Sequence, residues 1–406
     1  MNRYNSRKFS INQFLFQPLF KYNSYRIKKL SILLFSVCIA LFITSTWSIA
    51  VIEYPDTSIA VPMPDPQPTP EPATDSDPTP APEPTPDPTP TPEPVFDGEN
   101  PLTGLPFPGD LERNRPIAVV LSNEVAALPM NGVSDADIIY EYPVEGGLTR
   151  MMAIFQDFSN VVKVGSVRSA RHYTVQIATS YDAIFIHAGG SQPLAYNEIK
   201  ELGIPNFDEV GGTRREIFFR DRSRIGGRRV DNLHSVVTTN DRLFRRFSEY
   251  TFRKEHEDRF QHGLIFTDNG TPVRGDVAKD VLVRFSSGKS TSFVYDSAKE
   301  VYHLRQFNRD FVDANDNSKP AFTNVLVIKT SVSGIAGDGA GRQNVSTTGT
   351  GEGFFICGGK YVEINWSRQN KQSPYTYTNM DGTELELGRG KTFICIIPNR
   401  MNVTFE

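Results

Sequence analysis

Cysteine is scarce in this chain, which has 406 residues and only three cysteines, Cys38, Cys357 and Cys395. None of them has a further metal-ligating side chain at a suitable spacing, so we expect no metal ion, and no motif calls for a cofactor. Cys357 and Cys395 lie in apolar runs of the C-terminal part. They are either a disulfide pair or two buried free thiols, and the sequence leaves both alternatives open.

Charge of one sign is missing from two long segments, although the net charge is only −4. Residues 1–29 contain seven Lys or Arg and no acid, whereas residues 53–99 contain many acids and no base. Residues 30–52 carry no charge and are long enough to cross a bilayer as a helix. The positive-inside rule predicts a cytoplasmic tail, a single transmembrane anchor and globular parts outside the cytoplasm. A cleaved signal segment is the alternative.

The segment after the expected anchor has too little apolar surface to form a core. Nearly every second residue between 61 and 95 is proline, which favours an extended, disordered stalk over residues 53–99. Cys38 follows Phe35, Ser36 and Val37 inside the apolar run, whereas a lipid-attachment cysteine follows Leu and small residues at its end. Lipidation of Cys38 is therefore the less favoured interpretation, and we expect a single-pass protein of the cell membrane.

Strand-like and helix-like segments alternate over residues 100–270. Apolar runs of strand length occupy residues 115–123, 136–144, 151–158, 161–167 and 182–188. Helices are expected at about 169–180, 191–203 and 240–254, the first two capped by Ser169 and Ser191. This alternation predicts an α/β domain whose largely parallel or mixed sheet has helices on both faces.

Short β-branched and aromatic runs, separated by glycine turns such as Gly358-Gly359, fill residues 271–406. They predict a smaller, mainly antiparallel β domain. These strands could instead extend the first sheet, and both alternatives stay open. Within the first part, residues 206–232 break the alternation of strands and helices and are expected to form a long surface loop.

Three polar loops follow strand-like runs between residues 141 and 193. In open α/β sheets such loops meet at the carboxyl ends of the strands, where ligands bind. We therefore expect one cleft surrounded by Glu145, Arg150, Arg168, Ser169, Arg171, His187, Gly189, Gly190 and Ser191.

The turn Arg168-Ser169-Ala170-Arg171 suits an anion, because two guanidinium groups and backbone N–H groups at a helix start favour a carboxylate or phosphate. Alternatively, both arginines form salt bridges with Glu141, Glu145 or Asp182 and stabilise the fold. Gly189 and Gly190 would let a ligand approach the backbone. The loop lacks the spacing of a phosphate loop, a dinucleotide fingerprint or a nucleophile elbow, so Ser191 is interpreted as a helix cap.

Catalytic candidates are few. His187 could act as a general base, and Glu145 or Asp221 could supply a catalytic carboxylate, but structural roles are favoured for all three. His234 is a weaker candidate. The carboxylates of Glu141 and Glu145 have no histidine at ligand spacing beside them, so a metal is not expected. The sequence favours a binding protein over an enzyme.

Seven arginines lie between residues 214 and 229 and would suit nucleic-acid phosphates. The expected placement outside the cytoplasm argues against nucleic acid as a partner. Wall polymers, lipid head groups and peptidoglycan carboxylates remain as anionic partners. The alternative is a solvated loop whose charges pair with Glu209, Glu216 and Asp231.

Four segments of the sequence resemble the YerB-like family of bacterial lipoproteins. They are NPLTGLP at 100–106, EGGLTR at 145–150, GSVRSAR at 165–171 and HAGGS at 187–191, and the resemblance spans roughly residues 98–399. It implies an N-terminal α/β domain, a smaller C-terminal domain and export to the cell surface. The family's function is unknown, and it supplies no catalytic residues.

Two departures from the family pattern matter. Family members carry a lipobox cysteine, which Cys38 does not match, and residues 230–234 differ from the family's Pro-His-Asn-like run. The sequence as a whole favours a membrane-tethered extracytoplasmic protein that binds an anionic cell-envelope ligand or an envelope protein. The alternatives are an envelope hydrolase or transferase with an anionic substrate, and a scaffold for an envelope enzyme.

Overall fold

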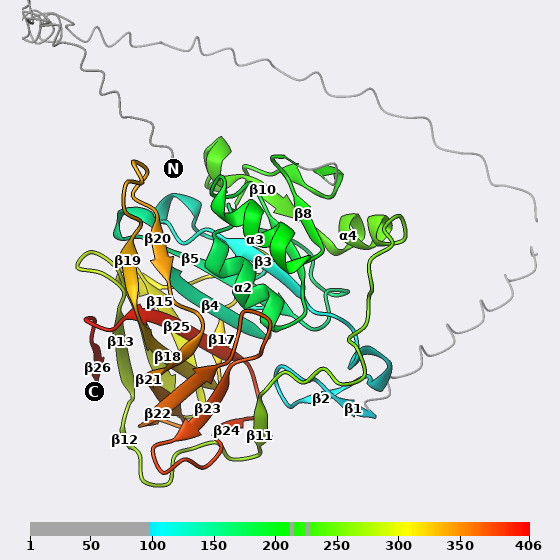
Figure 1. The fold of residues 1–406 in the computed structure, drawn as a ribbon. Coiled ribbons are helices and arrows are strands. Elements are labelled where there is room, and N and C mark those ends of the chain that lie inside the picture. The colour runs from blue at the N-terminus through cyan, green and yellow to red at the C-terminus, as the bar shows by residue number, and fades with distance from the viewer. Residues whose placement is uncertain (1–96, 212–214, 225–226) are drawn as a thin grey trace, which may run out of the picture. The chain divides into compact units, whose positions relative to one another are not determined.

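The computed structural model describes residues 97–211, 215–224 and 227–406 (Figure 1). The expected cytoplasmic tail, the membrane anchor and nearly all of the stalk lie outside these residues. Within the described part of the chain, no helix is both long enough and apolar enough to span a membrane.

Eleven strands from both halves of the chain form one mixed sheet. The N-terminal half supplies β3 (Ile117–Leu121), β4 (Ile138–Pro143), β5 (Thr149–Phe155), β7 (Ile184–His187) and β8 (Asn206–Asp208). The C-terminal half supplies β12 (Asp276–Val277), β18 (Asn324–Thr330), β21 (Gly349–Cys357), β22 (Lys360–Arg368), β23 (Thr376–Asn379) and β25 (Thr392–Pro398). Strands β3, β7 and β8 are parallel, as expected, whereas β5 runs antiparallel to both β3 and β4.

Strand β25 joins the two halves. It lies between β18 and β4, runs parallel to both, and appears in Figure 1 as the red strand that crosses the centre of the fold. The C-terminal strands therefore extend the first sheet, which was one of the two alternatives left open by the sequence. The C-terminal half is mostly β structure, and all three α-helices of the described residues belong to the N-terminal half.

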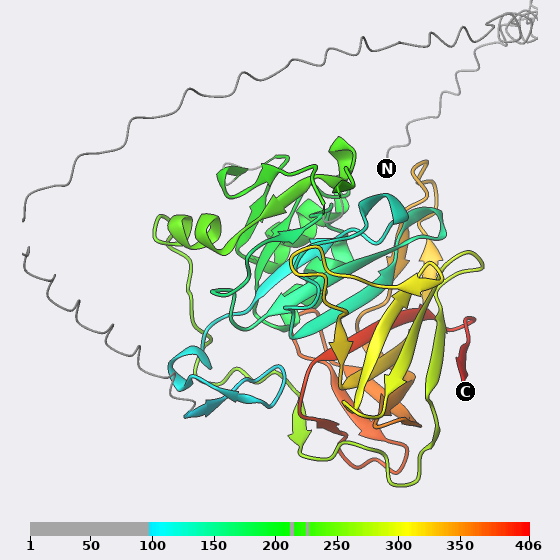
Figure 2. The same ribbon diagram turned by 180° about the vertical axis from the view of Figure 1, so that it is seen from behind.

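The two faces of the central sheet are covered differently. Helices α2 (His172–Ser180) and α3 (Leu194–Leu202) pack side by side on one face (Figures 1 and 2). Side chains of α4 (Asn240–Phe247) pack into the core on the other face. That face is also covered by an antiparallel sheet of β13 (Asp280–Arg284), β14 (Ser290–Asp296), β15 (Val301–Gln306), β16 (Arg309–Asp310), β17 (Ala321–Phe322) and β26 (Val403–Phe405).

Both helices on the first face begin later than the sequence suggests. Arg171 precedes α2 and Pro193 precedes α3, so neither Ser169 nor Ser191 caps a helix. The reason is that the two preceding loops bond to each other: the Ala170 N–H donates to the Gly189 carbonyl at 2.9 Å, and the Ser191 N–H to the Ala170 carbonyl at 3.1 Å. These residues form part of the loop pairing instead of a first helical turn.

Helix α4 is shorter than expected, and Thr239 caps its start. The Thr239 hydroxyl accepts a hydrogen bond from the Arg242 N–H, and the helix ends at Phe247 rather than near residue 254. The expected loop over 206–232 holds regular structure as well. It contains β8 and β9 (Phe219–Arg220), and β9 joins β6 (Val164–Gly165) and β10 (Val236–Thr238) in a small antiparallel sheet.

Three short pairs complete the fold: β1 (Gly98–Glu99) with β2 (Pro106–Phe107), β11 (Ile265–Thr267) with β24 (Glu386–Gly388), and β19 (Val332–Gly334) with β20 (Gln343–Val345). Short 3-10 turns η1 to η4 and η6 lie in the connections of the N-terminal half.

The two described cysteines are free, so the disulfide alternative is wrong. Alternate residues of a strand face opposite sides of its sheet. Cys357 belongs to the core on the sheet face that α2 and α3 also cover, whereas Cys395 packs into the core on the other face. Burial raises the pKa of the Cys357 thiol to about 11 and that of Cys395 well above its usual value, so both stay protonated at neutral pH.

Candidate functional site

The loops after β6 and β7 meet at the carboxyl ends of the parallel strands. Besides the two backbone bonds already described, the Ala188 N–H donates to the Arg168 carbonyl at 3.0 Å. The side chain of Arg150, at the start of β5, reaches this junction and donates from Nη1 to the Ser169 carbonyl at 2.6 Å. The structure thus brings Arg150, Ser169 and Arg171 together, with the Gly189 loop beside them.

Arg171 is neutralised by Glu145. Its Nε and Nη2 atoms each lie 2.6 Å from one carboxylate oxygen of Glu145, a two-pronged geometry that adds strength and direction. Burial disfavours the charge of Glu145, but the hydrogen bonds and charge of Arg171 outweigh it, so the pKa of Glu145 lies below its usual value. Glu145 is therefore a weak base, and Arg171 occupies both of its carboxylate oxygens.

Arg168 is also paired, with a carboxylate that the sequence did not point to. Its Nη2 lies 3.3 Å from Glu124 Oε1, and its Nη1 donates to the Leu233 carbonyl at 3.1 Å. Glu124 follows β3, so it too lies at the carboxyl ends of the strands. The salt-bridge alternative for Arg168 and Arg171 thus matches the geometry, with Glu124 in place of Glu141 or Asp182.

Arg150 differs from its two neighbours. It is 8% exposed, and no carboxylate of the described residues lies within salt-bridge distance. Its Nε atom is buried without a hydrogen-bond partner there. Burial, followed by the positive charges of Arg171 and Arg168, lowers the pKa of Arg150 to about 10. The group stays charged at neutral pH, and its charge is not compensated by a carboxylate contact.

His187 and the two glycines form a rigid loop around Asp208. The Gly189 N–H donates to Asp208 Oδ1 at 2.7 Å, and the Gly189 φ of +72° suits glycine. His187 is fully buried, with Nδ1 2.8 Å from the Gly189 carbonyl and 3.7 Å from Asp208. Burial lowers the pKa of His187 despite the Asp208 charge. A Cβ on Gly190 would lie 3.2 Å from Ala195, so this glycine serves close packing.

Of the remaining candidates, Asp221 and His234 have structural partners of their own, and the Ser191 hydroxyl has none among the described residues. Asp221 forms a salt bridge with Lys163 at 2.6 Å. His234 lies 3.4 Å from the Ser122 hydroxyl and 4.0 Å from Glu124. The Ser191 hydroxyl is buried without a partner in the described chain.

Glu141 is fully buried within the fold. It accepts hydrogen bonds from Asn123, Thr149 and Thr291 at 2.7–2.8 Å and lies 3.4 Å from Lys289 Nζ. Across residues 97–406, apart from the two short gaps, no group of three or more His, Cys, Asp or Glu side chains is arranged to hold a metal ion.

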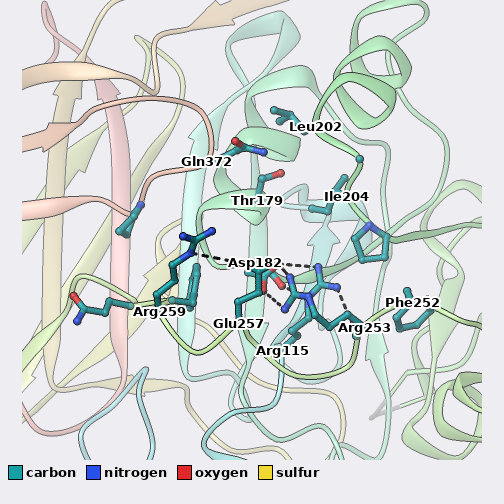
Figure 3. A pocket seen from close by; sticks show the side chains of 15 residues that line it. Arg115, Thr179, Asp182, Leu202, Ile204, Phe252, Arg253, Glu257, Arg259 and Gln372 are labelled. Carbon is teal, nitrogen blue, oxygen red and sulfur yellow. Dashed lines mark hydrogen bonds and ion pairs between the residues drawn. The ribbon is translucent and has the colours of Figure 1, made fainter.

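A cavity at the opposite ends of the same strands was missed by the sequence reasoning. Its volume is about 790 Å³, and it is lined by Arg115, which precedes β3, and Asp182, which precedes β7. Figure 3 shows Asp182 between the side chains of Arg115 and Arg253, with Leu202 and Ile204 on one wall. The available signal in the sequence was a charged residue two positions before each of two buried parallel strands.

Comparisons with known proteins identify the family. Residues 102–252 match the N-terminal domain, and residues 281–394 the C-terminal domain, of the family described as protein of unknown function DUF3048. The chain is 30% identical over 305 residues to "Putative lipoprotein YerB" of Bacillus subtilis (strain 168), which covers 74% of this chain and 86% of that protein. The crystal structure of YerB from Bacillus subtilis matches with a TM-score of 0.63 and 25% identity over 76% of this chain and all of that one. The chain therefore belongs to the YerB-like DUF3048 family, as the sequence motifs indicated.

Proposed function

We propose that this chain is an extracytoplasmic binding protein, tethered to the membrane, that holds an anionic cell-envelope ligand at its strand-end arginines, Arg150, Arg168 and Arg171. The observation that carries the proposal is the uncompensated charge of Arg150. A buried charge is costly unless it is paired, and an anionic group from outside would supply the missing partner.

A second buried arginine shows that the situation of Arg150 is unusual. Arg368 also lacks a carboxylate partner in the described structure, but its guanidinium donates to the carbonyls of Ser373, Thr347, Gln176 and Lys371 and lies over the Tyr375 ring. Arg150 donates one hydrogen bond of this kind. Its remaining donors make it the best placed group of the cluster to take an anion.

The cellular setting supports the choice of ligand. The similarity to a protein named as a lipoprotein favours an extracytoplasmic, membrane-associated location. The anionic groups available there are the phosphates of wall polymers and the carboxylates of peptidoglycan. The partners and pKa values of His187, Glu145 and Asp221 favour binding over catalysis.

The test compares retention of the purified full-length chain on cell-wall sacculi that carry phosphate-rich polymers with retention on the same sacculi after the polymers are removed. Arg150→Met removes the charge while keeping a long side chain, and we expect at least tenfold weaker retention. Because the substitution removes a buried charge, the thermal midpoint should be unchanged or higher. Arg305→Met removes an exposed, paired charge elsewhere and serves as the control. Equal retention of Arg150→Met and the wild type would refute the proposal.

A scaffold is the second candidate, and a specific observation favours it. Arg168 and Arg171 already form salt bridges with Glu124 and Glu145, so two of the three guanidinium groups are engaged within the fold. A scaffold would bind no wall polymer in any form, and the Arg150→Met variant would then still capture the same envelope enzyme as the wild type.

A further inference from the structure

The cavity at the amino ends of β3 and β7 has the size and the lining of a small-molecule site. Pockets that enclose small ligands measure roughly 300–1,000 Å³ and combine apolar walls with a few polar groups. This one measures about 790 Å³, with Phe252, Phe260, Leu202 and Ile204 among its apolar lining. It is separate from the strand-end arginines Arg150, Arg168 and Arg171. Those arginines lie at the carboxyl ends of the parallel strands β3 and β7, whereas the cavity lies at their amino ends.

Positive charge exceeds negative charge at the centre of this cavity. Asp182 Oδ1 lies 3.0 Å from Arg115 Nη2. The Asp182 carboxylate also accepts hydrogen bonds from both terminal nitrogens of Arg253, at 2.7 and 2.9 Å. Both guanidinium groups thus share one carboxylate. Arg115 otherwise donates only to backbone carbonyls in the described structure.

The remaining groups do not cancel this excess. His256 Nδ1 lies 3.0 Å from Asp182, so a third donor uses the same carboxylate. Burial disfavours the charge of Asp182, but the hydrogen bonds of His256 and Arg253 and the charge of Arg115 outweigh it and lower the pKa of Asp182. Arg259, at the rim, is 93% exposed, and its carboxylate partner in the described chain is the exposed Glu257 at 4.0 Å. Figure 3 shows Arg253 and Arg259 on either side of Glu257.

We propose that this cavity binds an amphipathic anion, in which a phosphate or carboxylate head group is attached to an apolar chain. Arg253 and Arg259 hold the head group, since both are accessible and Arg253 belongs to the pair with excess charge. Phe252, Phe260 and Ile204 receive the apolar part. The head group has two possible sources, a membrane lipid or a soluble amphipathic molecule.

The test uses the full-length chain in phosphatidylcholine nanodiscs and measures saturable binding of radiolabelled decyl phosphate above that of empty discs. Inorganic phosphate should compete at least tenfold less well than unlabelled decyl phosphate, because it cannot use the apolar walls. Arg253→Gln and Arg259→Gln should each weaken binding at least fivefold. Arg246→Gln is the matched control, since Arg246 is similarly exposed, at 37% against 40% for Arg253, and is also paired with a carboxylate.

Two results would overturn the proposal. Binding no greater than that of empty discs would show that the protein does not bind decyl phosphate. Unchanged affinity in both cavity variants, with thermal midpoints equal to the wild type, would show that the anion binds elsewhere. Nanodiscs that contain phosphatidic acid identify the source of the head group. If they displace decyl phosphate, the natural ligand is a membrane lipid; if decyl phosphate stays bound, the natural ligand is a soluble amphipathic molecule. If the cavity variants bind normally, weaker binding by Arg150→Met assigns the head group to the strand-end arginines. If the cavity variants lose binding, the strand-end proposal is still tested separately by retention on sacculi.

Discussion

The arginines at the two ends of the parallel strands differ in how their charge is balanced. Arg171 has a carboxylate to itself, Arg115 and Arg253 share one, and Arg150 has no carboxylate contact within the described structure. A buried guanidinium that has a carboxylate to itself gains less from an outside anion than one whose charge is shared or uncompensated, because its desolvation cost is already offset. The placement of Asp and Glu therefore decides which arginines can bind a ligand.

The Asp137 carboxyl, just before β4, should make stability depend on pH. Burial raises its pKa to about 6, against about 4 in an unfolded chain. Between pH 4 and pH 6 the folded state holds a proton that the unfolded state has released, so stability falls as pH rises through this window. Relative to the wild type, Asp137→Asn should gain on the order of 2 kcal/mol from pH 4 to pH 6, and the gain should level off about one pH unit above the raised pKa.

Urea unfolding of both proteins at pH 4, 5, 6 and 7 measures this difference. The Asn side chain loses one acceptor for the N–H groups of Gln156 and Asn100. That loss shifts the difference by the same amount at every pH, so only its pH dependence is informative. A difference that stays constant from pH 4 to pH 7 would contradict the raised pKa.

At the residue scale, the sequence predicted the arginines of the strand-end cluster but only one of their partners. Arg168 and Arg171 stand in a local motif, so their neighbourhood is visible in a short window. Glu124 lies 44 residues from Arg168, and Glu145 lies 26 residues from Arg171. Which distant acid meets which arginine depends on how the strands are ordered, and this order is not encoded locally.

At the scale of single elements, the strands were easier to predict than the helix starts. Buried runs such as residues 117–121 are recognisable from their apolar composition. The starts of α2 and α3 are set by pairing between two loops, a non-local interaction that overrides the local capping preference of Ser169 and Ser191. The end of α3 was predicted correctly because Gly203 acts through its own backbone.

Gly203 provides a test of that local effect. It ends α3 with a φ of +65°, and an added Cβ would meet no atom within 4 Å, so only backbone strain is probed. Gly203→Ala should lower the free energy of unfolding by about 1 kcal/mol. Gly339→Ala, in a loop where φ is not in the left-handed region and the space is also open, should have little effect. Equal urea midpoints for the two variants would contradict the role of Gly203.

At the scale of the whole molecule, a buried polar network reinforces the shared sheet. Glu141 on β4 belongs to the N-terminal half, while Lys289 and Thr291, at the start of β14, belong to the C-terminal half. Because β25 also joins β18 to β4, unfolding of the strands of one half would expose a buried sheet edge of the other half. The sequence left this arrangement open, since strand composition does not determine which strands become neighbours.

We therefore predict a single cooperative unfolding transition. Helical circular dichroism reports on the N-terminal half, and the fluorescence of Trp366 on β22 reports on the C-terminal half. The experiment uses a Trp47→Phe background, in which Trp366 is the remaining tryptophan. Both signals should share one urea midpoint. Two separated midpoints would show that the halves unfold independently despite the common sheet.

Lys289→Met should shift both signals together. It leaves the fully buried Glu141 carboxylate without its cation, which typically costs about 3–5 kcal/mol. Lys299→Met, which removes an exposed lysine near Asp296, is the matched control and should change stability by less than about 1 kcal/mol. A loss confined to the Trp366 signal would contradict the coupling between the halves.

The central position of β25 in the sheet has a consequence for folding during synthesis or translocation. Whether the chain emerges from a ribosome or from a translocation pore, it does so from its N-terminus, and β4 is delivered long before the strand that will lie next to it. Until residues 392–398 arrive, the facing edges of β4 and β18 have no partner between them. Until then the nascent chain has an open sheet edge, and such an edge is vulnerable to premature strand pairing.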